Sequence, residues 1–365
     1  MQGIAQFAKV AATNPVEFAD LNTNPDALKK GGLWLVVADF EGRIRCWRFA
    51  QRLSTLPMTG PDEPAWQGPK PKQWSSSLSR NQYEGAVTAV RDYVRAGTVY
   101  QANICRVLSA PLPVPGQAQA LARVLSAGNP APHEGFAHIV TGDPKTSGWL
   151  ASASPESFLS VWQDRDGTAH VSSAPIKGTA PTGGELLAKD ETENVMITDL
   201  VRNDLQRVCA PGTVEVTSLL EQRDLPGLVH LVSTVTGRLR VNPRTAPTEW
   251  AQLLALTLPA ASISGAPKSS ALRIIGELEP GPRGPYCGAI GWIDVDAGTC
   301  DLAVGIRTFW WQDQGPYGPA RLHFGTGAGI TWGSDPTAEW FETELKANRL
   351  IALASNTLVP EKETA

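Results

Sequence analysis

The stretch YCGAIGWIDVDAGTCDLAVGIRTFWW, residues 286–311, decides the expected fold. Apolar residues dominate two runs in it, near 286–295 and near 299–311, with a short break between them. Runs of this length and composition predict β-strands. A third strand is expected near 320–331, and a helix near 335–353 follows it.

The same kind of pattern extends toward the N-terminus. Two apolar runs, 33–38 and 44–49, flank Asp39-Phe40-Glu41-Gly42 and predict a β-hairpin. Further strands are expected near 99–108, 136–141, 148–153, 157–162, 169–174, 213–222 and 228–240, and helices near 82–96, 185–207, 247–257 and 268–278. Because runs of strands are separated by single helices, the pattern predicts an α+β fold with large antiparallel sheets.

A proline-rich stretch separates the first hairpin from the rest of the chain. Five prolines lie between positions 57 and 71, and three serines follow at 75–77. This composition is typical of an extended connection. We therefore expect three parts: a short β-containing N-terminal region with its connection at 1–78, a catalytic domain at 79–355 and a tail at 356–365.

Composition excludes several classes of protein. The 365 residues carry 32 basic and 36 acidic side chains, a formal charge of −4, which disfavours nucleic acid as a partner. Five widely spaced cysteines without a CxxC pair disfavour both a disulfide framework and a thiolate zinc site. No secretory signal is visible and the longest uncharged run, 250–267, is shorter than the roughly 20 apolar residues of a membrane span, so we expect a cytoplasmic protein.

The last expected helix carries charged residues on one stripe. Ser334-Asp335-Pro336 is a strong helix start, and Glu339, Glu342 and Lys346 follow at i, i+3 and i+7. Taken alone, this helix is better explained by a solvated surface face. Gly325-Thr326-Gly327-Ala328-Gly329, read as a tight turn just upstream, favours instead a site where backbone N–H groups and a cation hold an anionic ligand.

Two further groups of residues are candidates for chemistry. Acidic residues cluster at 190–204, and one glutamate from that helix with one from the last helix would suit Mg²⁺, which commonly takes one or two protein carboxylates. Glu156 and Lys177 bracket an expected strand pair that could bring them together. Lys177 is a candidate nucleophile with a depressed pKa, although an exposed lysine at a strand end is the simpler interpretation.

The chain resembles the chorismate-utilising enzymes over roughly residues 82–355. The resemblance lies in GTVYQAN at 97–103, SPESFL at 154–159, PIKGT at 175–179, ENVMITDLVRND at 193–204, VHLVS at 229–233, SGAPK at 264–268, RGPYCGAIG at 283–291, GIRT at 305–308 and GAGITWGSDPTAEWFETELK at 327–346. It implies the family's α/β/β/α fold, in which large antiparallel sheets pack face to face with helices outside.

Two positions sort the chemistries within that family. Isochorismate and salicylate synthases resemble one another in having a lysine where this chain has Gln101, which cannot activate water as a base. Anthranilate synthases have alanine where this chain has Lys177, and the PIKGT form is associated with aminodeoxychorismate synthases. The resemblance therefore implies component I of the aminodeoxychorismate branch, with the anthranilate branch as the alternative and a catalytically silent chorismate-binding subunit as a further one.

The resemblance also implies roles for individual residues. It makes Lys177 the nucleophile, Glu156 its acid/base partner and His230 a neighbour of the departing hydroxyl. Mg²⁺ is expected on Glu193 and Glu342 with Glu339 nearby. The expected chorismate contacts are Gly178, Thr179, Tyr286, Arg307, Gly327, Ala328, Gly329 and Lys346.

The resemblance is incomplete at two positions and implies a partner chain. Ala180 replaces the usual arginine after PIKGT, and Ala261 replaces a usual glycine, which could alter packing or substrate affinity. No cysteine-centred glutaminase segment is recognisable in the chain. Ammonia is therefore expected from a separate glutamine amidotransferase subunit or from free ammonium.

Overall fold

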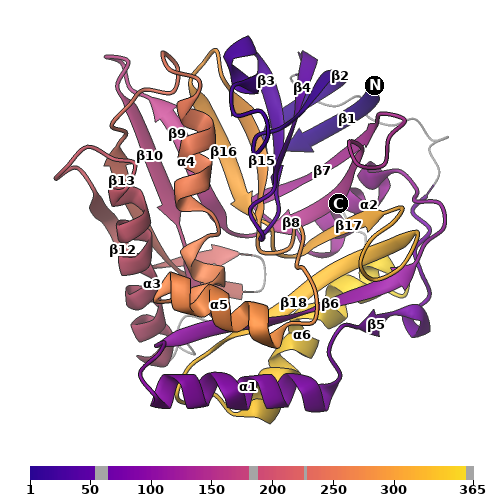
Figure 1. Ribbon diagram of the computed structural model, residues 1–365. Coiled ribbons are helices and arrows are strands. Elements are labelled where there is room, and N and C mark those ends of the chain that lie inside the picture. Colours follow the sequence, from indigo (N-terminus) through magenta and orange to yellow (C-terminus); the bar gives the residue numbers. More distant parts are fainter. Residues whose placement is uncertain (54–64, 181–187, 226–227, 359–365) are drawn as a thin grey trace.

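The computed structural model describes residues 1–53, 65–180, 188–225 and 228–358 of the chain. These residues form an α+β fold in which every strand pairing is antiparallel (Figure 1). The strands are β1 Gln2–Phe7, β2 Val10–Asp20, β3 Leu33–Ala38, β4 Ile44–Leu53, β5 Ser75–Ser76, β6 Gln101–Pro111, β7 His133–Val140, β8 Gly148–Ser154, β9 Ser157–Gln163, β10 Ala169–Ala174, β11 Ile176–Ala180, β12 Glu215–Leu225, β13 Leu228–Arg238, β14 Gly265–Ala266, β15 Ala289–Asp294, β16 Thr299–Val304, β17 Thr308–Gln312 and β18 Arg321–Ile330. The helices are α1 Arg80–Arg95, α2 Ala118–Gly128, α3 Ala188–Gln206, α4 Glu249–Thr257, α5 Lys268–Leu278 and α6 Pro336–Ala354, with short 3₁₀ turns that include η4 at Ala261–Ile263.

The strands form one continuous hydrogen-bonded ladder. Its order is β12, β13, β10, β9, β16, β15, β3, β4, β2, β1, β7, β8, β17, β18, β6, with β11 also on β13 and with β14 and β5 on β6. The ladder curls so that its two ends meet. The proximity is visible at Gly329 of β18, where an added Cβ would lie 3.1 Å from the Lys177 amine of β11. Lys177 and Gly329, 152 positions apart in the sequence, are thereby brought into one place.

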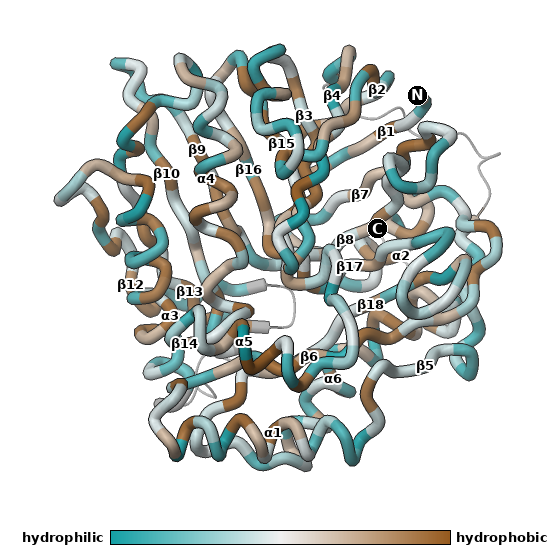
Figure 2. Tube along the Cα trace, in the orientation of Figure 1, coloured by the Kyte–Doolittle hydropathy of each residue, from teal (hydrophilic) through white to brown (hydrophobic). Residues whose placement is uncertain are grey.

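Helices cover the outer faces of this curled sheet. In Figure 1, α1 and α6 lie beneath β6 and β18, while α3 packs on β11 and β13 and α2 on β7 and β8. Ser79 caps α1 in a capping box with Gln82, and the helix alternates between hydrophobic and hydrophilic residues (Figure 2), which is the pattern of a helix with one packed face. Its buried residues are Tyr83, Ala86, Val87 and Val90.

The largest apolar core lies inside the curl and joins strands from both ends of the sequence. Trp34 and Trp47 from the N-terminal hairpin are fully buried in the same cluster as Leu302 of β16 and Val235 of β13. Burying aromatic side chains of this size stabilises a fold strongly. The N-terminal strands therefore share the core of the rest of the chain, since β3 pairs with β15 and β1 pairs with β7.

Most expected elements are confirmed. The hairpin at 33–38 and 44–49 is β3 and β4, the helix near 82–96 is α1, and the helix near 335–353 is α6. Two strands before residue 21 and the helix α2 were missing from the expectation. In the part of the chain that the structure describes, no break in the sheet marks the boundary that we expected near residue 78. The division of the chain into three parts stays a prediction.

One expectation about the C-terminal strands was wrong, and one alternative is excluded. The single strand near 299–311 is two strands, because Arg307 adopts a positive φ of 50° and turns the chain between β16 and β17. Gly325 to Gly329 lie within β18, which confirms the strand expected near 320–331 and excludes the tight turn that we also considered for these glycines. Glycine is required there by close approach, since a Cβ on Gly325 would lie 2.0 Å from the Tyr286 ring.

Across the described part of the chain, no helix has the length and apolar composition needed to cross a bilayer.

Candidate active site

Lys177 lies on the short strand β11, and its backbone is fixed from two sides. The Asn194 side chain of α3 donates to the Leu231 carbonyl at 2.9 Å and to the Lys177 carbonyl at 3.4 Å. Ser233 of β13 donates in turn to the Asn194 oxygen. Asn194 thus joins α3 to β11 and β13 directly behind the lysine.

The Lys177 amine faces the glycine strand β18. Gly329 pairs with Asn103 of β6, and a Cβ on Gly329 would lie 2.4 Å from the Gln101 amide nitrogen and 3.1 Å from Lys177 Nζ. Only a residue without a side chain lets these three groups approach one backbone position. Lys177 is therefore not an exposed lysine at a strand end, but a half-buried one held over β18.

The surroundings of Lys177 favour its neutral amine. Burial is the main cause and lowers the Lys177 pKa, and the nearby charge of Lys346 lowers it as well. The carboxylates of Glu193, Glu156 and Glu342 act in the opposite direction, so the candidate acid/base glutamate and two candidate metal-binding glutamates lie close to this amine. A lysine in such surroundings is a competent nucleophile.

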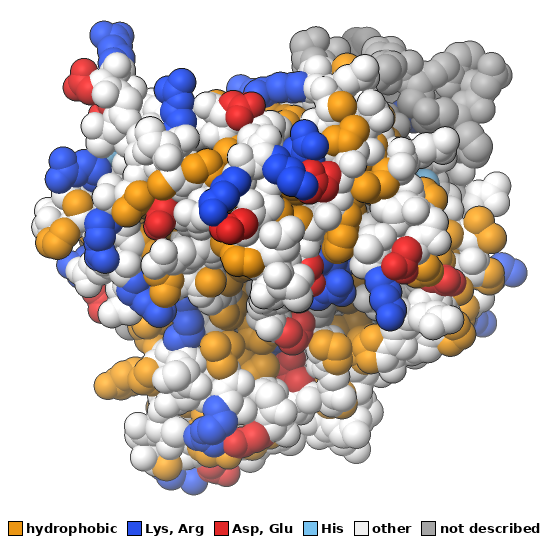
Figure 3. Space-filling model, turned by 45° about the horizontal axis from the view of Figure 1, so that its top comes forward, with side chains coloured by type: hydrophobic (Ala, Val, Ile, Leu, Met, Phe, Trp, Pro, Cys, Tyr) orange, Lys and Arg blue, Asp and Glu red, His pale blue; other side chains and the backbone are white. Residues whose placement is uncertain are grey.

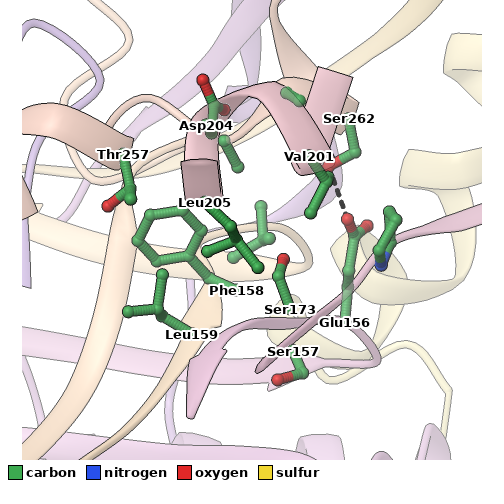
Figure 4. A pocket seen from close by; sticks show the side chains of 14 residues that line it. Glu156, Ser157, Phe158, Leu159, Ser173, Val201, Asp204, Leu205, Thr257 and Ser262 are labelled. Atoms are coloured by element: carbon green, nitrogen blue, oxygen red, sulfur yellow. Dashed lines mark hydrogen bonds between the residues drawn. The ribbon is translucent and has the colours of Figure 1, made fainter. Parts of the chain in front are cut away.

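Glu156 lies between β8 and β9 and is 4% exposed. Its Oε1 accepts a hydrogen bond of 2.5 Å from the Ser262 hydroxyl, shown as a dashed line in Figure 4. Burial raises the pKa of Glu156 to about 7, although the Ser262 hydrogen bond and the charge of Lys177 lower it. A carboxyl with this pKa can both give and take a proton near neutral pH.

His230 and Arg307 form a second part of the site. His230 lies on β13 opposite Thr179, and burial together with the charge of Arg307 lowers its pKa to about 4, so the imidazole is neutral at pH 7. Burial also lowers the pKa of Arg307, and no acidic side chain in the described ranges compensates its charge. A half-buried guanidinium of this kind suits a carboxylate of a bound ligand.

The three glutamates expected to bind metal come from α3 and α6. Glu339 is 6% exposed, whereas Glu342 is half-exposed and pairs with Lys346 at 2.6 Å. That i,i+4 pair is what a solvated face would show, but Lys346 also donates to the Gly327 carbonyl at 3.2 Å, which ties α6 to β18. The stripe is therefore part of the same region as Lys177.

These carboxylates suit a partly hydrated hard cation. Oxygen donors are what Mg²⁺ prefers, and Glu193 and Glu342 both act on the Lys177 amine. Among the residues that the structure describes, no three acidic, histidine or cysteine side chains converge into a ready-made metal cage. Mg²⁺ on Glu193 and Glu342 would thus keep water or ligand oxygens in its remaining positions.

The remaining expected contacts differ in where they lie. Tyr286 is buried in the main core with its ring against Gly325, and Ala328 is buried in the cluster under α1. Gly178 adopts a φ of 86°, a conformation that favours glycine. The backbone of Thr179 pairs with His230, and its side chain lies outside the described part of the structure.

Acidic side chains are visible inside a recess of the molecule with hydrophobic side chains on both sides of it (Figure 3). Such a recess suits a small ligand that has an apolar ring and several charged groups.

Sequence reasoning missed three polar residues behind the reacting groups. They are Ser262, Asn103 and Asn194, and all three are buried. Ser262 is a polar residue inside the long uncharged run 250–267, and Asn194 lies within the ENVMITDLVRND segment. A buried polar side chain needs a hydrogen-bond partner. A polar residue inside an otherwise apolar run or a family motif was therefore the signal by which these residues could have been found.

The chain was compared with known proteins. The family of chorismate binding enzymes matches residues 27–352. Anthranilate synthase component 1 2 of Haloarcula marismortui is 37% identical over 286 residues, with 74% of this chain and 49% of that protein covered. Aminodeoxychorismate synthase component 1 of Klebsiella aerogenes is 35% identical over 291 residues, with 76% and 59% covered. The chain thus spans about half to three-fifths of the length of these curated relatives.

Solved structures agree on the fold. Anthranilate synthase component I from Streptococcus pneumoniae superposes with a TM-score of 0.73 at 23% identity, over 96% of this chain and 90% of that one. The menaquinone-specific isochorismate synthase MenF from Escherichia coli superposes with a TM-score of 0.74 at 16% identity, over 97% and 88%.

Proposed function

The chain belongs to the chorismate binding enzyme family, and from this premise we propose that it is an aminodeoxychorismate synthase component I. The proposed reaction converts chorismate and ammonia to 4-amino-4-deoxychorismate and water. The observation that carries the proposal is the Lys177 amine, half-buried on β11 with a lowered pKa and close to Glu156. An amine in this place makes a covalent route available.

In the first proposed step, the Lys177 nitrogen attacks C2 of chorismate. Both ring double bonds shift by one position, from C1=C2 to C1=C6 and from C5=C6 to C4=C5, and the bond between C4 and its hydroxyl oxygen breaks. Glu156 in its protonated form donates the proton with which that hydroxyl leaves as water. Because the Glu156 pKa is about 7, a large share of the enzyme holds this proton at neutral pH.

In the second proposed step, ammonia adds at C4 and the bond between C2 and the lysine nitrogen breaks. The electron pair of that bond returns to Lys177, and Glu156, now a carboxylate, takes a proton from the incoming nitrogen. Two displacements place nitrogen at C4, which a single attack by ammonia at C2 would not do. His230, neutral at pH 7, lines the side on which the hydroxyl departs.

The charged groups around the amine are proposed to hold the substrate. Arg307 would bind one carboxylate of chorismate, and Lys346 with the β18 backbone would bind near the other. Mg²⁺ on Glu193 and Glu342, with Glu339 nearby, would supply positive charge that holds the ring carboxylate and stabilises charge as the hydroxyl leaves. A separate glutamine amidotransferase chain would supply ammonia.

Anthranilate synthase component I is the second candidate. Relatives with that printed name match this chain as well as those named for aminodeoxychorismate synthase, for example one of Thermus thermophilus at 38% identity over 291 residues. In that case ammonia would attack C2 directly and Lys177 would not bond to the ring. The two candidates therefore differ in the position of the new nitrogen.

Product identification separates the candidates. Purified protein is incubated with chorismate, Mg²⁺ and ammonium salts, and the product is analysed with and without an added aminodeoxychorismate lyase. We expect 4-aminobenzoate only when the lyase is present. Fluorescent 2-aminobenzoate without the lyase would instead establish the anthranilate reaction, and intact chorismate in both samples would refute both.

A further inference from the structure

We propose that Ser262 is a positioning residue, which holds the Glu156 carboxyl group in the orientation from which it exchanges protons with the reacting ring. This role deepens the proposed function and rests on it. Glu156 touches the reacting atoms in the proposal, whereas Ser262 acts only through Glu156.

The contact between the two residues is short and fully enclosed. Ser262 lies in η4 and is 4% exposed, and its hydroxyl donates to Glu156 Oε1 at 2.5 Å. The backbone of Ile176, the residue before Lys177, also stabilises the ionised carboxylate and lowers its pKa. Figure 4 shows the Glu156 side chain pointing at Ser262, while the hydroxyl of Ser173 in the same pocket makes no bond to it. The Ser262 hydroxyl is thus the side-chain donor that orients the carboxyl group.

Ser262 itself is held firmly in place. Its backbone carbonyl accepts a hydrogen bond from the Asn103 side chain at 3.2 Å, and Arg283 donates to the next carbonyl, that of Ile263, at 3.1 Å. On the other side of η4, Lys268 donates to the Pro259 carbonyl at 2.9 Å and pairs with Asp204 at 2.6 Å. One buried cation, Arg283, one partly buried cation, Lys268, and the Asn103 amide therefore hold the segment that presents the hydroxyl.

The same network reaches the floor of the site. Gln101 donates to Asn103 at 3.2 Å, and both side chains lie against Gly329, where the Lys177 amine also approaches. Asn103 therefore links the segment that orients Glu156 to the strand beneath the nucleophile. This connection gives the acid/base group and the nucleophile a shared framework.

Removing the Ser262 hydroxyl is expected to raise the pKa of Glu156. The charged group that acts on Glu156 from the neighbouring elements is Lys177 of β11, while Asp204 of α3 lines the far end of the pocket and is paired with Lys268. The Ser262 hydrogen bond stabilises the ionised carboxylate and lowers the Glu156 pKa. Without it, we expect this pKa to rise by about one to two units, the scale of a hydrogen bond to a charged group.

The test compares Ser262→Ala, Ser262→Cys and Ser262→Thr with Ser173→Ala as the matched control, which deletes another buried hydroxyl of the same pocket. Chorismate consumption is followed against pH, so that the result does not depend on which aminated product forms. We expect Ser262→Ala to lower kcat about 10-fold at nearly constant KM and to move the limb governed by Glu156 to higher pH by about one to two units. Ser262→Cys should lie between Ala and wild type, and Ser262→Thr close to wild type.

An infrared titration of the ligand-free protein keeps this inference separate from the proposed function. The carboxyl band of protonated Glu156 is assigned as the band that Glu156→Gln removes, and its midpoint should rise in Ser262→Ala but not in Ser173→Ala. An unchanged midpoint in Ser262→Ala and Ser262→Cys would overturn the role of Ser262. Absence of chorismate turnover in the wild type with the expected infrared shift would overturn the proposed function alone.

Discussion

Substitution of Gly329 by alanine tests whether β18 must lack a side chain beneath Lys177, the proposed nucleophile. The added Cβ would lie 2.4 Å from the Gln101 amide nitrogen, 2.9 Å from the Asn103 amide oxygen and 3.1 Å from Lys177 Nζ. Gly329 does not have a positive φ, so alanine adopts its backbone conformation without strain. The whole effect therefore comes from the displaced side chains.

The expected size follows from these distances. Gln101 must retreat by about 1 Å to reach ordinary contact, and Lys177 by a few tenths of an ångström; a misplacement of about 1 Å in a catalytic site can cost roughly 10²-fold in rate. Overpacking of a well-filled region costs about 1–3 kcal/mol of stability, less where the contacted atoms are the ends of side chains that can turn away. We expect a folded protein with turnover lowered about 10²-fold.

The assay is chorismate consumption at saturating Mg²⁺ and ammonium, together with urea unfolding. Gly333→Ala is the matched control, because a Cβ there meets no atom within 4 Å, and it should keep wild-type turnover. Turnover of Gly329→Ala within about twofold of wild type, in a protein of normal stability, would show that the three side chains do not converge on this strand.

Three further predictions concern the charged groups. Lys177→Ala should lower C4 amination on the order of 10³-fold or more while chorismate affinity, measured by calorimetry, changes only a few-fold; wild-type turnover would refute covalent catalysis. Glu342→Gln should raise the Mg²⁺ concentration for half-maximal activity roughly 10-fold or more, because even substitutions of residues that support a metal ligand lower metal affinity by about 10-fold. An unchanged Mg²⁺ titration would overturn the metal assignment. Glu156→Gln should make the folded protein more stable than the wild type above pH 7. The Glu156 pKa is about 7 in the folded state, above its ordinary value of 4.5, so between these pH values the folded wild type binds a proton that the unfolded chain has lost. The wild type therefore loses about 3 kcal/mol of stability as pH rises from 4.5 to 7. Urea unfolding at pH 5 and pH 8 measures this difference. An equal change in the free energy of unfolding between the two pH values for both proteins would contradict the raised pKa.

Much of the fold follows from local pattern. Apolar runs such as 33–38 and 148–153 form strands because they have the short length and the apolar composition that are typical of buried strands. Ser79 and Asp335 each cap the helix that follows them. The break at Arg307 could not be foreseen, since a positive φ in a non-glycine residue depends on tertiary contacts. The strand near 320–331 was expected, but the sequence also suggested a turn at its glycines. Glycine is needed there because Tyr286 and Lys177, which are distant in sequence, approach the strand closely.

The site was predictable only in part for the same reason. Residue types and family motifs pointed to Glu156, Lys177 and the glutamates of the two helices. What the sequence does not contain is the curl of the sheet, which brings β11 onto β18 and η4 onto Glu156. Supporting residues such as Ser262 and Asn194 therefore become visible only when their hydrogen-bond partners are known.

The most direct test of the central claim is mass spectrometry of the protein mixed with chorismate and Mg²⁺ in the absence of ammonia. We expect an adduct with the mass of chorismate less one water, located by peptide mapping on Lys177 and absent from Lys177→Ala. A protein that stays unmodified, and that upon addition of ammonium releases an aromatic amine with nitrogen next to the ring carboxylate, would contradict it.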